Sequence, residues 1–277
     1  MLVETDAVES LSNSSALVYS TFLDGIANDF GESIRIDTNL NAYVTGYTES
    51  DDFPMTSGAF ETSHNSIVGI GDVFVSKLNE TGSQLIYSTY LGGTDIDWGN
   101  SIKINSEGNI YITGPTWSTD FPVTSNAYDM SIGGFTDTFV AKLNLEGNST
   151  NDLVYATYLG GNDDDSGWQV ETGPTPPMLR PSLVLDNENN VYISSHTNSS
   201  NFPTTSDAYD ASFTGVRDGF IAKLNANGST LLYSTYLGGS SEDIATLITI
   251  DSVKDLYIIG FTTSPEPLLN CVTTART

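Results

Sequence analysis

The chain has 277 residues, enough for one large all-β domain or two small ones. Its 35 acidic and 9 basic residues give a formal net charge of −26, and a negative field of that size repels phosphate backbones and anionic lipid headgroups. We therefore expect no nucleic-acid partner, and no membrane insertion, because no window of 18 apolar residues occurs.

The ends of the chain add few constraints. The single cysteine, Cys271, excludes an intrachain disulfide and a cysteine-based zinc site. Residues 1–16, an N-terminal extension, lack the basic and apolar regions of a secretory signal peptide.

The acid excess favours cations and solubility, as in a salty or extracellular setting. No motif indicates a redox cofactor.

One motif recurs four times and divides the chain into repeats. "LVYSTFL" at Leu17 returns as "LIYSTYL" at Leu85, "LVYATYL" at Leu153 and "LLYSTYL" at Leu231. Between these copies, "DFP" or "NFP" and then segments such as "DTFVAKLN" follow in a constant order. We predict repeat 1 at residues 17–84, repeat 2 at 85–152, repeat 3 at 153–230 with a Pro-rich insertion at 171–182, and a partial repeat 4 with a C-terminal tail at 231–277.

Each complete repeat predicts four short strands rich in Tyr, Val, Ile, Phe and Thr. In repeat 2 they cover residues 85–91, 101–105, 109–114 and 138–144. The last strand alternates, with Phe139, Ala141 and Leu143 on one face and Val140 and Lys142 on the other. Short turns such as "SEG" and "NETGS" join the strands, so an up-and-down antiparallel meander is expected.

Such a meander cannot bury both faces alone, so the repeats must pack face to face around an axis. This predicts an all-β fold, a β-propeller built of four-stranded antiparallel blades with about four repeats. A β-solenoid would have a period of about 20–30 residues, and separate sandwiches would need about 100 residues each.

The order of these motifs, from "LVYSTYLGG" through "GNxYITG" and "DFP" to "FVAKLN", resembles the SBBP-type β-propeller repeats of bacteria and archaea. The resemblance covers nearly the whole chain. It implies one blade per repeat, commonly in rings of about seven, within secreted or cell-surface proteins that have no established enzymatic activity. We therefore expect an extracellular or cell-surface location.

The fourth repeat stops short, because no "DFP" loop or "FVAKLN" strand follows residues 255–261. The 15 strand candidates leave one blade incomplete, and its exposed edge invites pairing with further blades. Residues 268–273 or residues 1–16 are candidates for the missing strand. Two arrangements stay open, an incomplete ring and a self-closed ring of four blades.

One acid recurs six positions after the leucine that ends the first strand of each repeat: Asp29, Asp97, Asp165 and Asp243. A position repeated in every blade fits a loop cap that accepts backbone N–H groups better than it fits a single catalytic centre. The alternative is a Ca²⁺ site, with Asp163 in the segment "NDDDSG" as a further ligand, because Ca²⁺ prefers oxygen ligands. Ca²⁺ is the one cofactor that the sequence leaves open.

The remaining polar and aromatic candidates favour structural roles. His196 takes a place that other repeats fill with Tyr, Pro or Phe, and His64 has no second histidine or cysteine near it. Lysines recur once per complete repeat (Lys77, Lys142 and Lys223), and phenylalanines precede the repeated prolines (Phe53, Phe121 and Phe202). We expect the lysines to pair with acids or lie along the blade, and the phenylalanines to anchor long loops. Three tryptophans could stack on sugar rings: Trp98, Trp117 and Trp168.

The sequence therefore predicts a non-catalytic propeller scaffold of an exported or cell-surface protein that binds a protein or glycan ligand. The alternative is a cation-dependent domain that binds or cleaves extracellular glycans as a hydrolase or lyase. For that alternative, the only repeat with an unusual cluster is the third, with Asp163, Asp164, Asp165 and Arg180.

Overall fold

A computed structural model describes residues 17–66, 70–166 and 180–265. It contains 14 β-strands and one short 3-10 helix, η1 (Ser149–Asp152), and the described residues form no α-helix. No helix in these ranges has the length and hydrophobicity needed to cross a membrane.

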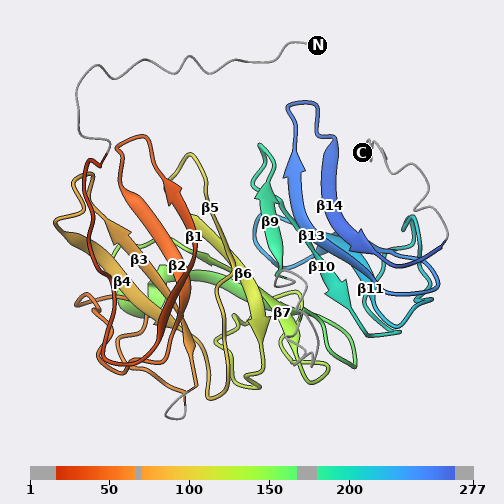
Figure 1. Ribbon diagram of the computed structural model, residues 1–277, viewed down its shortest axis with the longest axis horizontal. Coiled ribbons are helices and arrows are strands. Elements are labelled where there is room, and N and C mark those ends of the chain that lie inside the picture. The colour runs from red at the N-terminus through yellow and green to blue at the C-terminus, as the bar shows by residue number, and fades with distance from the viewer. Residues whose placement is uncertain (1–16, 67–69, 167–179, 266–277) are drawn as a thin grey trace.

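The strands form four antiparallel sheets that follow one another along the chain (Figure 1). The first sheet contains β1 (Asp29–Ile36), β2 (Ala42–Thr48), β3 (Asp72–Leu78) and β4 (Leu85–Leu91). The second contains β5 (Ser101–Ile104), β6 (Ile110–Thr116), β7 (Asp137–Leu143) and β8 (Leu153–Leu159). The third contains β9 (Ser182–Leu185), β10 (Val191–Thr197), β11 (Asp218–Leu224) and β12 (Leu231–Leu237), and the fourth contains β13 (Asp243–Ile250) and β14 (Leu256–Thr262). The prediction of an all-β propeller with four-stranded antiparallel blades is confirmed.

The grouping of strands into sheets differs from the predicted grouping by one strand. Segments 85–91, 153–159 and 231–237, expected to begin their repeats, instead end the preceding sheets as β4, β8 and β12. The reason is the turn before each of them, which folds the chain into a hairpin with the preceding strand. Gly82 precedes β4 with a φ of +65°, Gly147 precedes η1 and β8 with a φ of +76°, and Gly228 precedes β12 with a φ of +69°.

The first copy of the motif, residues 17–23, is not a strand, which leaves 14 strands where 15 were expected. It lies against the first sheet. A Cβ built on Gly82 would fall 2.3 Å from the Tyr19 ring, and Leu23 packs against Phe53, Phe74 and Tyr90. A Cβ on Gly228 would likewise fall 2.2 Å from Tyr155 of the preceding blade. Residues 17–23 therefore take the place that the last strand of a preceding blade takes elsewhere.

The sheets pack face to face as blades, and each interior sheet buries both of its faces. On β7, Phe139, Ala141 and Leu143 join the apolar cluster shared with the first sheet, whereas Val140 joins the cluster shared with the third. This confirms the predicted alternation. The first strands of successive sheets also contact one another, β1 with β5, β5 with β9 and β9 with β13.

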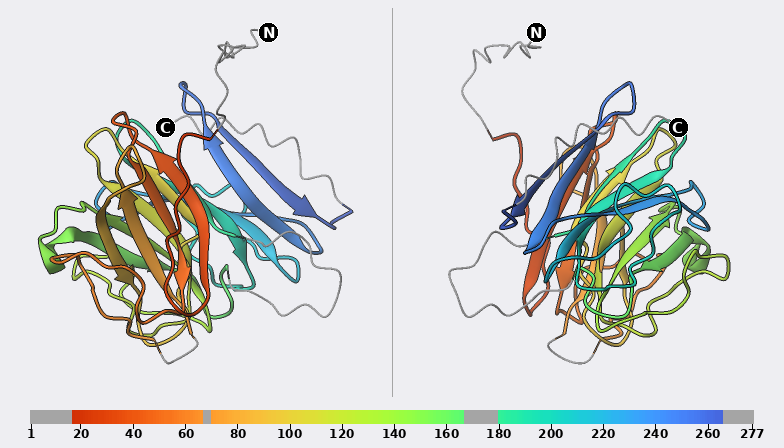
Figure 2. Two further views of the ribbon diagram at one scale, coloured as in Figure 1. Left: turned by 60° about the vertical axis from the view of Figure 1, so that its left-hand side comes forward. Right: turned by 90° about the vertical axis from the view of Figure 1, so that its right-hand side faces the viewer.

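The described sheets form an incomplete propeller and do not close into a ring. Figure 2 shows the β13–β14 sheet at one end of the arc. At the other end, Ile34 on β1 is 54% exposed, whereas Ile102, the corresponding residue on β5, is fully buried. The two segments considered for the missing strand, residues 1–16 and 268–273, lie outside the described residues.

The long loop after the second strand of each complete sheet is anchored by the predicted phenylalanine. Each anchor ring lies within 4.3–4.6 Å, centroid to centroid, of a phenylalanine on the third strand, in the pairs Phe53–Phe74, Phe121–Phe139 and Phe202–Phe220. Buried hydroxyls of the fourth strand hold the same loops, as in Tyr158, which donates a hydrogen bond to the Ser118 carbonyl at 2.7 Å. The loop ends are therefore fixed on the sheet by both apolar and polar contacts.

We expect Phe139→Ala to lower the free energy of unfolding by about 3–5 kcal/mol, because it opens a cavity in the packing between two blades. Chemical denaturation monitored by circular dichroism measures this change. Phe135→Ala is the matched control, because Phe135 lies four residues earlier and is 72% exposed. Equal losses in both variants would contradict the role assigned to the interface between blades.

Candidate functional site

The repeated aspartate at the start of each sheet ties its loop to the end of the second strand. Its Oδ2 atom accepts the backbone N–H of the residue four positions earlier, at 2.8 Å in the pair Asp97–Gly93. The same oxygen accepts a serine hydroxyl, at 2.7 Å from Ser118 to Asp97. Both contacts recur around the other members of this set, Asp29, Asp165 and Asp243. The geometry is that of a polar loop cap.

A second set of repeated aspartates, which the sequence analysis did not single out, begins the third strand of each complete sheet: Asp72, Asp137 and Asp218. All three are at most 1% exposed. Asp137 Oδ2 accepts the Gly133 N–H at 2.9 Å, and Asp218 Oδ2 accepts the Thr214 N–H at 3.1 Å. The available signal was the first letter of "DVFVSKLN", "DTFVAKLN" and "DGFIAKLN", which served only to mark the repeat.

The structure brings the two sets together where neighbouring sheets meet. The N–H of Asp97 donates to the carbonyl just before Asp72, at 2.9 Å, and the contacts of Asp165 and Asp243 with the carbonyls of Thr136 and Arg217 repeat this link. We call the pairs Asp72–Asp97, Asp137–Asp165 and Asp218–Asp243 the junction carboxylates. Each pair joins the third strand of one sheet to the loop that enters the next.

A glycine makes room for the junction carboxylates. A Cβ built on Gly92 would lie 2.6 Å from Asp72 Oδ1 and 2.8 Å from Asp97 Oδ2, so the two carboxylates flank one backbone position. At Gly160 the nearest atom would be Asp137 Oδ1 at 2.1 Å, and at Gly238 it would be Asp218 Oδ1 at 2.4 Å. Repeat 1 has Asp24 at this place. The described residues place no third-strand aspartate beside Asp24.

Burial shifts the protonation of the junction carboxylates. It raises the pKa of Asp97 to about 8, those of Asp137 and Asp165 to about 7, and that of Asp218 to about 6. The negative charge of the partner adds to the rise, from Asp72 on Asp97, from Asp165 on Asp137 and from Asp243 on Asp218. Hydrogen bonds from nearby hydroxyl and N–H groups oppose the rise without cancelling it.

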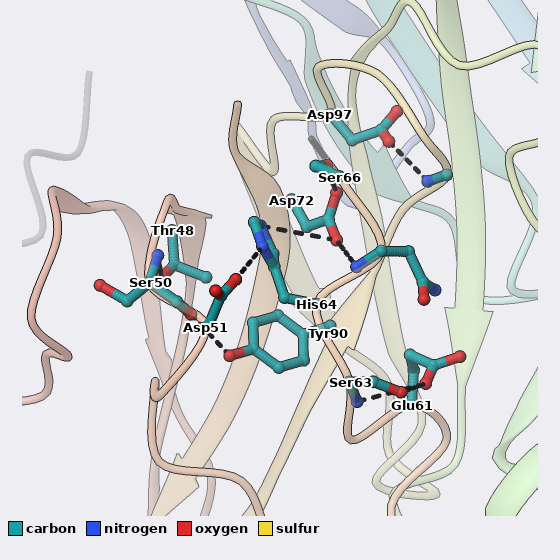
Figure 3. A network of polar contacts seen from close by, with 12 residues as sticks. Thr48, Ser50, Asp51, Glu61, Ser63, His64, Ser66, Asp72, Tyr90 and Asp97 are labelled. Carbon is teal, nitrogen blue, oxygen red and sulfur yellow. Dashed lines mark hydrogen bonds and ion pairs between the residues drawn. The ribbon is translucent and has the colours of Figure 1, made fainter. Parts of the chain in front are cut away.

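The first junction contains additional polar groups (Figure 3). Ser66 donates to Asp72 Oδ1, and the N–H of Asn65 donates to Oδ2 at 3.1 Å. His64, whose side chain is 2% exposed, lies 2.9 Å from Asp51 through Nδ1 and 3.8 Å from Asp72 through Nε2. Burial raises the pKa of Asp72, and the hydrogen bonds from Ser66 and Asn65 oppose that rise. His64 therefore belongs to a polar network that the sequence did not indicate.

The acidic segment of repeat 3 does not gather its side chains at one point. Asp165 faces the second junction, whereas Asp163 is exposed and accepts the N–H of Asp164 at 2.9 Å. Arg180 forms an ion pair with Glu32 of the first sheet. Across the described ranges, no group of three or more His, Cys, Asp or Glu side chains is placed to hold a metal ion. Trp168 lies outside the described residues.

The repeated lysines lie over tyrosine rings of the second strand. Each ammonium lies 4.9–5.2 Å from the ring centroid, in the pairs Lys77–Tyr43, Lys142–Tyr111 and Lys223–Tyr192. Lys223 also lies 3.7 Å from Asp186. Their stems lie along the blade as expected, and the acids of the junctions are not their partners.

Two of the three tryptophans belong to a row of rings that crosses from the first blade to the second. Tyr47 stacks on Phe30 at a centroid distance of 4.7 Å and on Trp98 at 5.0 Å, and Trp117 meets Trp98 edge-on at 5.6 Å. Sugar stacking needs a free ring face. Tyr47 lies between two other rings, and Trp98 packs against both Tyr47 and Trp117, so the row is part of the contact between the two blades. His196, which is 1% exposed, occupies the place of Tyr47 in the third sheet.

We expect Gly160→Ala to lower the free energy of unfolding by about 1–3 kcal/mol, because the new methyl group would overlap the Asp137 carboxylate. Gly31→Ala is the control, because its Cβ would meet only Val44, at an ordinary contact distance of 3.8 Å. Urea titration of both variants measures the difference. Equal stability of the two variants would show that the carboxylate does not need this space.

In buffer containing EDTA, we expect stability to fall as the pH rises from about 4 to about 8. Asp97, Asp137, Asp165 and Asp218 have raised pKa values in the folded state, so folding retains protons that the unfolded chain has released. Their contribution is complete below the unfolded pKa near 4 and is lost through the folded values of about 6 to 8. Urea titrations at intervals of pH measure the trend, and Asp97→Asn should flatten its upper end. A flat or rising wild-type profile between pH 5 and 8.5 would contradict it.

Comparison with known proteins agrees with this geometry. The family model described as "SBBP: Beta-propeller repeat" matches residues 25–54 and 86–122. No curated protein matches the sequence. A crystal structure of a protein of unknown function from Dyadobacter fermentans DSM 18053 is 13% identical, with a TM-score of 0.41 over 86% of this chain and 65% of that chain. This chain thus spans less than two thirds of that protein, and the likeness is too distant to indicate a function. The family match identifies SBBP β-propeller repeats at residues 25–54 and 86–122, and the motifs and sheets of the other described repeats resemble them.

Proposed function

We propose that the chain is a non-catalytic β-propeller scaffold of an exported or cell-surface protein, and that it mediates protein binding or adhesion. The acid excess and the resemblance to secreted repeat proteins support the location. The uniform junctions between blades favour a scaffold, because the same aspartates recur in each repeat. The exposed edge and face of β14 carry the binding part of the proposal.

Among the described residues, β14 pairs only with β13, so these residues leave the backbone groups of its other edge unpaired. One face of β14 is also open, with Tyr257 52%, Ile259 66% and Phe261 46% exposed. The residue that corresponds to Tyr257 in the second sheet, Tyr111, is fully buried and lies under a lysine. An edge strand with a free apolar face is suited to binding by strand addition.

The internal repeats define the chemistry of the added strand. Leu237, Ile258 and Gly260 help to line an open pocket of about 130 Å³ beside β14. In the second sheet, the residue opposite the corresponding glycine, Gly114, is Phe139, which packs in the same cluster as Leu91 of the first sheet. A strand with the pattern Asp-x-Phe-x-x-Lys-Leu would therefore fill this pocket with its phenylalanine and place its lysine over Tyr257. We propose such a strand from a further repeat as the partner of β14.

The alternative drawn from the sequence, a cation-dependent glycan-binding or glycan-cleaving domain, receives less support. Trp98 already packs against Tyr47 and Trp117, and Arg180 is paired with Glu32 rather than with the acids of repeat 3. Binding to a glycan array with release of shortened sugars would favour this alternative over the scaffold.

We expect a synthetic peptide with the sequence of residues 218–225, DGFIAKLN, to bind the full chain, because it supplies both the phenylalanine and the lysine. Fluorescence anisotropy of the labelled peptide measures the affinity. Phe261→Ser should weaken binding by about tenfold or more, since it removes one wall of the pocket. Met130→Ser, at an exposed apolar residue far from β14 in the sequence, should leave the affinity unchanged.

A peptide in which aspartate replaces the phenylalanine is the specificity control and should not bind. Equal binding of both peptides would refute recognition through the pocket. A chain that ends at residue 265 tests whether residues 266–277 compete for the edge, and in that case it would bind more tightly than the full chain. Dimerisation that the peptide cannot reverse would point to a second copy as the occupant.

A further inference from the structure

We propose that the junction carboxylates bind hard divalent cations, best matched by Ca²⁺, and that each ion links two neighbouring blades. The pairs are Asp72–Asp97, Asp137–Asp165 and Asp218–Asp243. This inference is independent of the partner of β14, since it concerns how the blades are held together.

The first argument is that these pairs contain buried carboxylate oxygens with no well-formed hydrogen bond. At the second junction these atoms are Asp137 Oδ1 and Asp165 Oδ1, at the third they are Asp218 Oδ1 and Asp243 Oδ1, and at the first the atom is Asp97 Oδ1. Neighbouring groups such as the Thr116 and Thr197 hydroxyls oppose the rise in the pKa of Asp97 and Asp165 without cancelling it. Buried carboxylate oxygens are costly unless a cation, a proton or a donor compensates them.

The second argument is that the protein supplies almost no positive charge at these places. Among the ion pairs formed by the described residues, only the contact of His64 with Asp72, at 3.8 Å, involves a junction carboxylate. Arg217 directly precedes Asp218, yet its guanidinium pairs with Glu242 at 2.8 Å. Three repeated pairs of acids whose only ion pair among the described residues is this single contact with a histidine, in a chain with a net charge of −26, leave the compensation to a bound ion.

The third argument is that backbone carbonyl oxygens lie close to the second and third pairs. A Cβ on Gly215 would lie 3.0 Å from Asp218 Oδ1, 3.1 Å from the Gly239 carbonyl and 2.0 Å from the Ser241 carbonyl. At the second junction, the corresponding carbonyls of Gly161 and Asp163 lie beside Gly133 and Gly134.

The two carboxylates of a pair, with carbonyl, hydroxyl and water oxygens, match the ligands that Ca²⁺ accepts. Zinc, which favours nitrogen and sulfur ligands, is a poor match. Since only two acidic side chains contribute to each junction, water and backbone oxygens must complete the coordination.

Three of the loop aspartates proposed from the sequence, Asp97, Asp165 and Asp243, thus belong to these sites, and each needs a third-strand aspartate that the sequence analysis did not include. Asp29 has no such partner among the described residues, and Asp163 does not share a site with Asp165 through its side chain. We therefore assign neither Asp29 nor Asp163 to a cation site.

Equilibrium dialysis with radioactive Ca²⁺ and thermal melts at pH 8 test the proposal on the full chain. We expect about three bound ions per chain, one for each pair, and a higher melting temperature in Ca²⁺ than in EDTA. Mg²⁺ at the same concentration should raise the melting temperature less, because it keeps its water ligands more firmly. No bound Ca²⁺ and identical melts in Ca²⁺ and EDTA would overturn the proposal, and the pairs would then hold shared protons.

The double variant Asp137→Asn with Asp165→Asn removes one pair and should reduce the stoichiometry from about three to about two. In EDTA at pH 8 it should melt at a higher temperature than the wild type, because the repulsion between two buried charges is gone. The control, Glu80→Gln with Asp207→Asn, removes the same charge at exposed positions and should retain all of the sites. Unchanged Ca²⁺ binding by the junction variant would overturn the assignment.

A measurement on the wild-type chain keeps the test decisive if the variant does not fold. Tb³⁺ can replace Ca²⁺ and emits when a nearby tyrosine or tryptophan is excited. Tyr158 lies close to the first junction, because its hydroxyl donates to the carbonyl of Ser118 and the hydroxyl of Ser118 donates to Asp97. We expect sensitised emission that Ca²⁺ displaces and Mg²⁺ does not. Emission that Ca²⁺ cannot displace, or no emission, would overturn the proposal.

Discussion

The packing of one sheet face against the next is the constraint on which the rest of the structure depends. A four-stranded sheet has two apolar faces, and each interior sheet buries both of them against its neighbours. Phe139 and Val140 are adjacent on β7 and fully buried, yet they belong to different interfaces. The cost of an uncovered face is visible at both ends of the arc, where Ile34 and Ile259 are exposed. Each blade therefore depends on the blades beside it.

The same interfaces contain the most unusual electrostatic feature of the chain. Pairs of acids lie where the third strand of one sheet meets the loop that enters the next, and glycines such as Gly92 leave space for them. Apolar burial alone does not require carboxylates here, and buried like charges oppose association. Because the pairs recur, the proposed cations would act at each described junction between blades in the same way.

Repeat 1 differs from the others at places that touch a preceding blade. Phe22 stands where the other repeats have Tyr90, Tyr158 and Tyr236, whose hydroxyls bind loop carbonyls of their own sheets. Asp24 stands where the others have a glycine that accommodates a third-strand carboxylate. Among the described residues, no third strand of a preceding sheet lies beside residues 17–24, so neither a hydroxyl nor an empty space is needed there. The opposite end retains the features of an interior blade in β14, so the two ends of the arc present different chemistry.

The sequence by itself determined the repeat, the strand content, the alternation on the third strand, the phenylalanine anchors and the loop aspartates, because these depend on local pattern and on comparison between repeats. It did not determine which strand closes which sheet, because a motif carries the same letters whether it begins one sheet or ends another, and hairpin geometry at Gly82 and Gly228 decides between them. It also did not show that Asp97 faces Asp72, or that His64 reaches Asp51, since these contacts join segments on different loops and sheets. Only the packing of one blade on the next brings two separately repeated acids to one point, and pairwise proximity of this kind has no signature in the spacing along the chain.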